Sequence, residues 1–150
     1  MKILILAIGK MKRAGLSDAL KEYEQRLRAP VEIKEFDIKE SNSKRLQQKE
    51  SAALLKAIPP GAYVIAMDGK GKQLESREFA AKLQKLRQSH KTLVFLIGGT
   101  DGHTPELLKK ADFTLSFGTM TWPHRLARVM LVEQLYRAQE IAAGNPYHRE

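Results

Sequence analysis

Short apolar runs alternate along the chain with polar stretches in which apolar residues recur every three or four positions. The runs at residues 3–8 and 92–97 are almost entirely apolar and are each followed by glycine, which is typical of strands buried on both faces. The run at residues 31–38 alternates imperfectly, so a less buried strand is expected there. In all, the pattern predicts strands at residues 3–8, 31–38, 62–67, 92–97 and 113–117.

The intervals between these runs have the spacing and end signals of helices. Thr104-Pro105 is a cap followed by a proline in the first turn, and Gly144 closes the longest periodic stretch. The predicted helices run from Ser17 through Leu27, from Ser43 to before Pro59, over 75–88, from Thr104 onward, and over 124–143. Because strands and helices alternate, we expect a single domain over residues 1–150, with a mainly parallel sheet and helices on both faces.

Composition narrows the possible partners and chemistry. Lys and Arg number 26 against 17 Asp and Glu, a formal net charge of +9, which indicates a polyanionic partner and leaves RNA, DNA and an anionic membrane surface open. There is no cysteine, which excludes disulfides and thiol chemistry, and the 4 histidines lack ligand spacing, so no metal site is expected. No run is long enough to span a membrane and no secretory signal is recognisable, so a cytoplasmic location is expected.

Three predicted strand ends carry residues suited to a ligand, which in open parallel sheets binds at the carboxyl ends of the strands. Met67 is followed by Asp-Gly, for which a plain turn is the simpler explanation. A phospho-accepting receiver is excluded because the first strand ends in Gly9-Lys10 rather than in acids. The turn at 98–102 offers bare backbone, although a tight turn into a capped helix is the simpler alternative. The segment 118–125 could wrap a flat heterocycle, or be a structural loop with its tryptophan in the core.

The end of the chain has two further features. The helix predicted over 124–143 is apolar around most of its circumference, which favours a dimer partner. The tail that follows contains Tyr147, His148 and Arg149, which offer stacking, proton transfer and phosphate contact, although chain ends are commonly frayed.

Several of these segments together resemble the ribosomal RNA large subunit methyltransferase H family of the SPOUT superfamily. The matching pieces are Gly9-Lys10 after the opening strand, the turn at 96–102, the segment 115–124, the helix segment 128–138 and the closing residues 145–149. The resemblance spans the whole length, and its last two segments are highly specific.

The resemblance implies an α/β fold with a C-terminal trefoil knot, a homodimer, and methyl transfer from S-adenosylmethionine to N3 of a pseudouridine in 23S ribosomal RNA on the assembled ribosome. It implies that the knotted loops bind the cofactor through Met67, Gly98, Gly99, Gly118, Thr119, Met120, Thr121, Trp122 and Pro123. It also implies that the tail forms the target site across the dimer. There His148 would be the general base or a proton relay, and Arg149 would contact phosphate or a developing oxyanion. Tyr147 would stack on the target nucleobase or position it.

Other basic residues are candidates for contact with RNA. At the start of the long helix these are His124 and Arg125. Elsewhere they are Lys70, Lys72, Arg77, Lys82, Lys85, Arg87 and Lys91. Two alternatives to the main function stay open: a non-catalytic RNA-binding module associated with the ribosome, and a methyltransferase that acts on another RNA or on protein.

Overall fold

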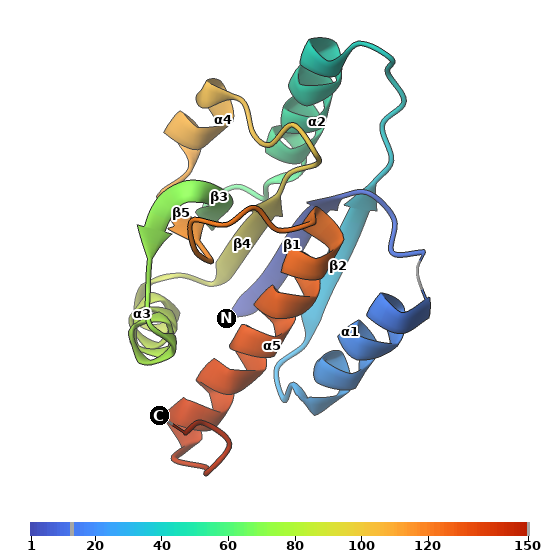
Figure 1. The fold of residues 1–150 in the computed structure, drawn as a ribbon. Coiled ribbons are helices and arrows are strands. Elements are labelled where there is room, and N and C mark those ends of the chain that lie inside the picture. Colours follow the sequence, from blue (N-terminus) through green and yellow to red (C-terminus); the bar gives the residue numbers. More distant parts are fainter. Residues whose placement is uncertain (13, 150) are drawn as a thin grey trace.

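All five strands of the computed structural model, which describes residues 1–12 and 14–149, lie in one sheet (Figure 1). They are β1 (Lys2–Ile8), β2 (Val31–Phe36), β3 (Tyr63–Gln73), β4 (Thr92–Ile97) and β5 (Phe113–Ser116). Their order is β2-β1-β4-β3-β5, and every neighbouring pair is parallel. Every strand therefore ends at the same edge of the sheet, here called the carboxyl edge.

Helices cover both faces of this sheet, as the alternating pattern predicts (Figure 1). The helices are α1 (Ala14–Arg26), α2 (Ser43–Ala57), α3 (Ser76–Ser89), α4 (Pro105–Lys110) and α5 (His124–Ala143). One face carries α1, α3 and α5, and the other carries α2 and α4. Strand β1 shows why its run is apolar throughout: Ile3 and Ile5 pack toward the first group of helices, and Leu4 and Leu6 toward the second.

The helix signals are largely confirmed. The Thr104 hydroxyl accepts a hydrogen bond from the Leu107 amide at 3.2 Å, which caps α4, and Gly144 ends α5 with a φ of 72°. The expected start at Ser17 is wrong, because α1 begins at Ala14. Leu16 already packs against the core, so the apolar stripe of α1 begins before Ser17.

Strand β3 is longer than predicted, and β2 shorter, ending at Phe36. The Asp-Gly-Lys-Gly segment after Met67 does not end β3: Leu115 of β5 pairs with both Met67 and Lys72, and the register shifts between them. Gly71 makes this return possible, because a Cβ there would lie 2.7 Å from the backbone carbonyl of Thr114. The expected plain turn is therefore an irregular part of the strand.

No helix in the described part of the chain is both long and apolar enough to cross a membrane. The trefoil knot and the single-domain organisation implied for the chain stay predictions.

Candidate functional site

The three strand ends singled out in the sequence meet around one cavity of about 450 Å³ at the carboxyl edge. Its wall is formed by three groups of residues: Met67, Asp68, Gly69 and Lys70; Ile97, Gly98, Gly99, Thr100, Asp101 and Gly102; and Leu115, Phe117, Gly118, Thr119, Met120, Thr121, Trp122, His124 and Ala127. Every residue expected to bind a cofactor is among them except Pro123. That proline is instead the N-cap residue of α5, and its carbonyl accepts a hydrogen bond from the Ala127 amide at 2.9 Å.

The glycine turn of the cavity is held from behind by α2. Gln47 donates from Nε2 to the carbonyls of Asp101 at 2.9 Å and His103 at 3.2 Å. A Cβ on Gly99 would lie 2.9 Å from both carboxylate oxygens of Glu50, so a larger residue there would have to displace this buried carboxylate. The tight-turn alternative is thus part of the explanation: glycine is needed for packing behind the turn as well as for bare backbone at its front.

Two buried titratable side chains support the same turn. Glu50 is 6% exposed, its Oε1 atom has no hydrogen-bond partner, and burial together with nearby Asp101 raises its pKa. Burial lowers the pKa of His103, which keeps that ring neutral, and its Nε2 lies 3.2 Å from the Leu96 carbonyl. Neither side chain lines the cavity, and nothing in their sequence context indicated that both would be buried.

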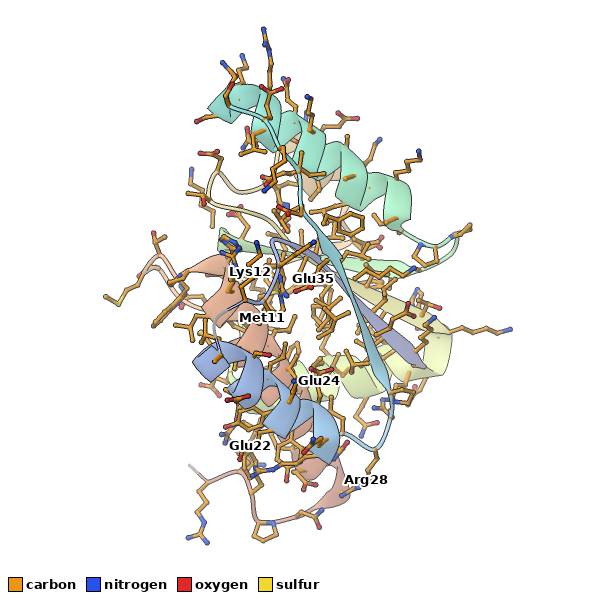
Figure 2. The ribbon with its side chains drawn as sticks, turned by 90° about the vertical axis from the view of Figure 1, so that its right-hand side faces the viewer. Met11, Lys12, Glu22, Glu24, Arg28 and Glu35 are labelled. Atoms are coloured by element: carbon orange, nitrogen blue, oxygen red, sulfur yellow. The ribbon has the colours of Figure 1, made fainter. Side chains whose placement is uncertain are left out.

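The first turns of α5 clamp the end of β1 beside the cavity. Arg128 is fully buried and donates to the Gly9 carbonyl at 2.7 Å, to the Ile8 carbonyl at 3.3 Å and to the carboxylate of Glu35. Glu35 also accepts from the Met11 amide at 2.8 Å, and Figure 2 shows the two residues together. Burial raises the pKa of Glu35, but these donors outweigh it, and the net shift is downward.

His124 belongs to the cavity itself. Burial lowers its pKa, and the positive charges of Arg125 and Arg128 lower it further, so the imidazole is neutral at neutral pH. Arg125 lies just outside and donates from Nε to the Lys10 carbonyl at 2.7 Å. Sequence reasoning placed His124 in the candidate ligand segment 118–125 and gave it contact with RNA as its role, but did not name it as a proton acceptor in the cavity.

Two large apolar side chains stand exposed at the rim of the cavity. Met120 is 74% exposed and Trp122 is 41% exposed, although both line the cavity. The alternative that placed Trp122 in the core is therefore wrong. Exposed apolar surface of this kind beside a concave site is suited to a flat ring.

The tail does not reach this cavity within one chain. Tyr147 donates to Glu133 at 2.9 Å, Arg137 donates to Nδ1 of His148 at 3.1 Å, and the Asn145 side chain donates to Glu140 at 2.8 Å. These contacts fold the tail back on the far half of α5, away from the loop that precedes the helix (Figure 1). Burial and the bond to Glu133 raise the pKa of Tyr147 to about 12, so the phenol stays protonated.

A second cavity of about 540 Å³ lies between the first one and the tail. It shares Leu115, Phe117 and Gly118 with the first cavity and contains Glu133, which accepts the hydrogen bond from Tyr147. Apolar side chains from different elements line it as well, among them Tyr23 of α1, Phe79 of α3 and Met130 of α5.

Comparison with known proteins identifies the family. The family model described as "Predicted SPOUT methyltransferase" matches residues 1–148. The chain belongs to the SPOUT methyltransferase family. The resemblance seen in its motifs is confirmed.

Relatives of this SPOUT chain match it from end to end. Two that carry the name "Ribosomal RNA large subunit methyltransferase H" come from Rhodospirillum centenum, 43% identical, and Paramagnetospirillum magneticum, 44% identical; each match covers 99% of both chains. Among solved structures, a probable methylase family protein from Haemophilus influenzae has a TM-score of 0.57 at 13% identity, over 99% of this chain and 70% of that one. At that identity the likeness supports the SPOUT fold alone.

Proposed function

We propose that this chain transfers a methyl group from S-adenosylmethionine to N3 of a pseudouridine in 23S ribosomal RNA, on the assembled ribosome. The observation that carries the proposal is the convergence, around one cavity, of the three segments expected to bind the cofactor. Family membership and the name shared by the relatives support methyl transfer to large-subunit ribosomal RNA. A ribosomal substrate suits the net charge of +9 and would place the protein in the cytoplasm.

The residues of the cavity fit S-adenosylmethionine. Its volume of about 450 Å³ lies within the range of small-molecule sites. Gly98 and Gly118 leave backbone groups accessible, and Trp122 offers a ring face to a purine. The carboxylates of Asp68 and Asp101 lie in the same wall, where they offset positive charge on a ligand. When bound, the cofactor supplies a methyl group on a sulfonium whose leaving group is neutral.

Side chains of the protein must align the target pseudouridine with the methyl group and accept its N3 proton. His124 is neutral and lies in the cavity, so it can accept a proton there. Because the tail is remote within one chain, we propose that it completes the site from a second subunit of a homodimer. In that arrangement His148 is the general base or a proton relay, and Arg149 contacts phosphate or the developing oxyanion. Tyr147 positions the target nucleobase.

Two measurements test the function. Calorimetry with S-adenosylmethionine should give binding heat; its absence at millimolar cofactor would leave the non-catalytic RNA-binding module as the function. Mass mapping of 23S ribosomal RNA from cells with and without the gene should then show the methyl group on the pseudouridine only when the gene is present. A methyl group lost instead from another RNA or from a protein would support the other alternative.

Mixed dimers test the shared site. One subunit carries Gly69→Leu, which is designed to block the cavity, and the other is truncated after Pro146. Neither variant alone should methylate ribosomes. If the tail acts across the interface, mixing equal amounts should restore about a quarter of wild-type activity, since half of the dimers are mixed and each has one complete site. Activity that stays absent after verified subunit exchange, or a truncated protein that is active alone, contradicts the proposed role of the tail.

A further inference from the structure

The structure separates the basic residues that the sequence could only group together. Lys91 directly precedes β4 and lies at the edge of the sheet opposite the cavity, and Arg87 lines a different hollow, formed by α3, α5 and the residues that follow α1. In contrast, Lys70 lines the cavity, and besides burial the charges of Lys72 and Lys85 both lie close enough to Lys82 to lower its pKa. We call Lys70, Lys72, Lys82 and Lys85 the lysine track.

Lys82 of the track lies over two aromatic side chains. Its ammonium lies 4.0 Å from the ring centre of Phe113 and 5.6 Å from that of Tyr63. Burial lowers the pKa of Lys82, and the charges of Lys72 and Lys85 lower it further. The aromatic contacts therefore hold the ammonium of Lys82 close to two other positive charges, those of Lys72 and Lys85, which repel it.

No carboxylate in the described residues forms an ion pair with Lys72, Lys82 or Lys85. Burial raises the pKa of the Tyr63 phenol and nearby Asp112 raises it further, but the Oδ2 of Asp112 already accepts a hydrogen bond from the Val64 amide at 2.8 Å. Glu78, one turn before Lys82 on α3, instead accepts a hydrogen bond from the Glu75 amide at 3.1 Å. The cluster thus gathers like charges without an internal counter-ion, which is unfavourable unless an external anion supplies one.

The irregular part of β3 joins this cluster to the cavity. Lys70 lies in the wall of the cavity, and Lys72 is paired with Leu115 where the strand returns to β5. From there the chain curves into α3, which carries Lys82 and Lys85 (Figure 1). The four lysines therefore lie on consecutive segments of the chain, from the cavity wall through the end of β3 to α3.

We propose that the lysine track binds the phosphate backbone of the ribosomal RNA that flanks the methylated nucleotide. This inference rests on the proposed function and adds the surface that holds its substrate. RNA is favoured over other anions because the track begins in the wall of the cavity that must receive a nucleotide. The charges also follow a path rather than a single pocket, as a polyanionic strand requires.

The test compares two triple variants with the same loss of charge. Lys72→Gln/Lys82→Gln/Lys85→Gln removes the three track lysines outside the cavity wall, whereas Lys56→Gln/Lys109→Gln/Lys110→Gln removes three lysines of α2 and α4 on the opposite face of the sheet. The KM for 70S ribosomes is measured at several salt concentrations, together with S-adenosylmethionine binding by calorimetry. A second track variant, Lys72→Gln/Lys85→Gln, keeps the contact of Lys82 with the rings of Phe113 and Tyr63, in case the triple variant unfolds.

For the track variants we expect the KM to rise about tenfold or more near physiological salt, with unchanged cofactor affinity. The slope of log KM against log salt should fall by roughly 0.7–0.9 for each phosphate that the variant no longer neutralises. The control triple should behave like wild type. Equal effects in the two triples would overturn the inference, as would loss of binding to anionic vesicles with an unchanged ribosome KM. If wild type itself does not methylate ribosomes, the proposed function fails instead.

Discussion

Arg128 offers a direct measure of how far one buried side chain organises the carboxyl edge. Replacing it by methionine keeps the aliphatic stem in its packed position and removes only the guanidinium. The carbonyl of Gly9, at 2.7 Å, and the more distant carbonyl of Ile8, at 3.3 Å, then lose their donor.

The expected cost follows from these hydrogen bonds. A buried hydrogen bond to a charged donor contributes about 1.5–3 kcal/mol, and the longer bond to Ile8 contributes less. Glu35 is 34% exposed, so water can replace much of its ion pair with Arg128. Removing the buried guanidinium, whose Nε atom has no hydrogen-bond partner, also removes its desolvation penalty, which offsets part of the destabilisation. The balance is a destabilisation of about 3 kcal/mol.

Urea denaturation at fixed protein concentration measures this change, because dimerisation would otherwise shift the curve. With a slope of about 2 kcal/mol/M, the midpoint should fall by about 1.5 M. The matched control is Arg125→Met, one turn earlier in α5, where the bond to Lys10 at 2.7 Å lies in a partly exposed region. That variant should lose about 1 kcal/mol or less. A midpoint for Arg128→Met at or above that of Arg125→Met would refute the reasoning.

The difference in the free energy of unfolding between wild type and Arg128→Met is predicted to depend on pH. The pKa of Glu35 is lowered in the fold, so its stabilising contribution is present above its unfolded pKa and is lost as pH falls through the folded value. The difference between wild type and Arg128→Met should therefore narrow in acid. A difference that stays constant from neutral pH to below pH ~4 would show that Glu35 does not take part.

Three further outcomes are expected. Gly69→Leu should weaken S-adenosylmethionine binding about tenfold or more in calorimetry, whereas Gly15→Leu should not; a Cβ meets no atom within 4 Å at either position, but only Gly69 lines the cavity. Because the pKa of His124 is lowered in the fold, its contribution to stability is present above about pH 6.5 and lost below it, and His124→Asn should flatten the decline between pH 7 and 5; parallel profiles would contradict this. Glu140→Ala frees the side chain of Asn145, so the methylation rate should fall with unchanged cofactor affinity, and adding Asn145→Ala should cost nothing more; additive losses would mean that the two act separately.

Local signals were sufficient for much of this fold. The cap at Thr104 and the stop at Gly144 lie within a few residues of the ends they specify, and the apolar run of β4 indicates burial on both faces without reference to any partner. The three ligand-ready strand ends also follow from sequence, because parallel strands bring their carboxyl ends to one edge.

The parts that sequence reasoning missed depend on partners far along the chain. Sequence reasoning gives Arg128 no structural role, because its partners, Glu35 and the end of β1, lie far from it along the chain. The Asp-Gly-Lys-Gly segment reads as a turn because nothing nearby shows that Leu115 pairs on both sides of it. The exposure of Trp122 and the fold-back of Tyr147 onto Glu133 likewise depend on which surfaces remain uncovered once the helices pack.

The cavity wall also has a consequence for folding order. Its three parts come from residues 67–70, 97–102 and 115–127, and α5, which closes it, is the last helix of the chain. During synthesis from the N-terminus, the first two parts emerge from the ribosome before the third. A nascent chain therefore cannot form the complete cavity until α5 has been made and docked, so cofactor binding would report that folding is finished.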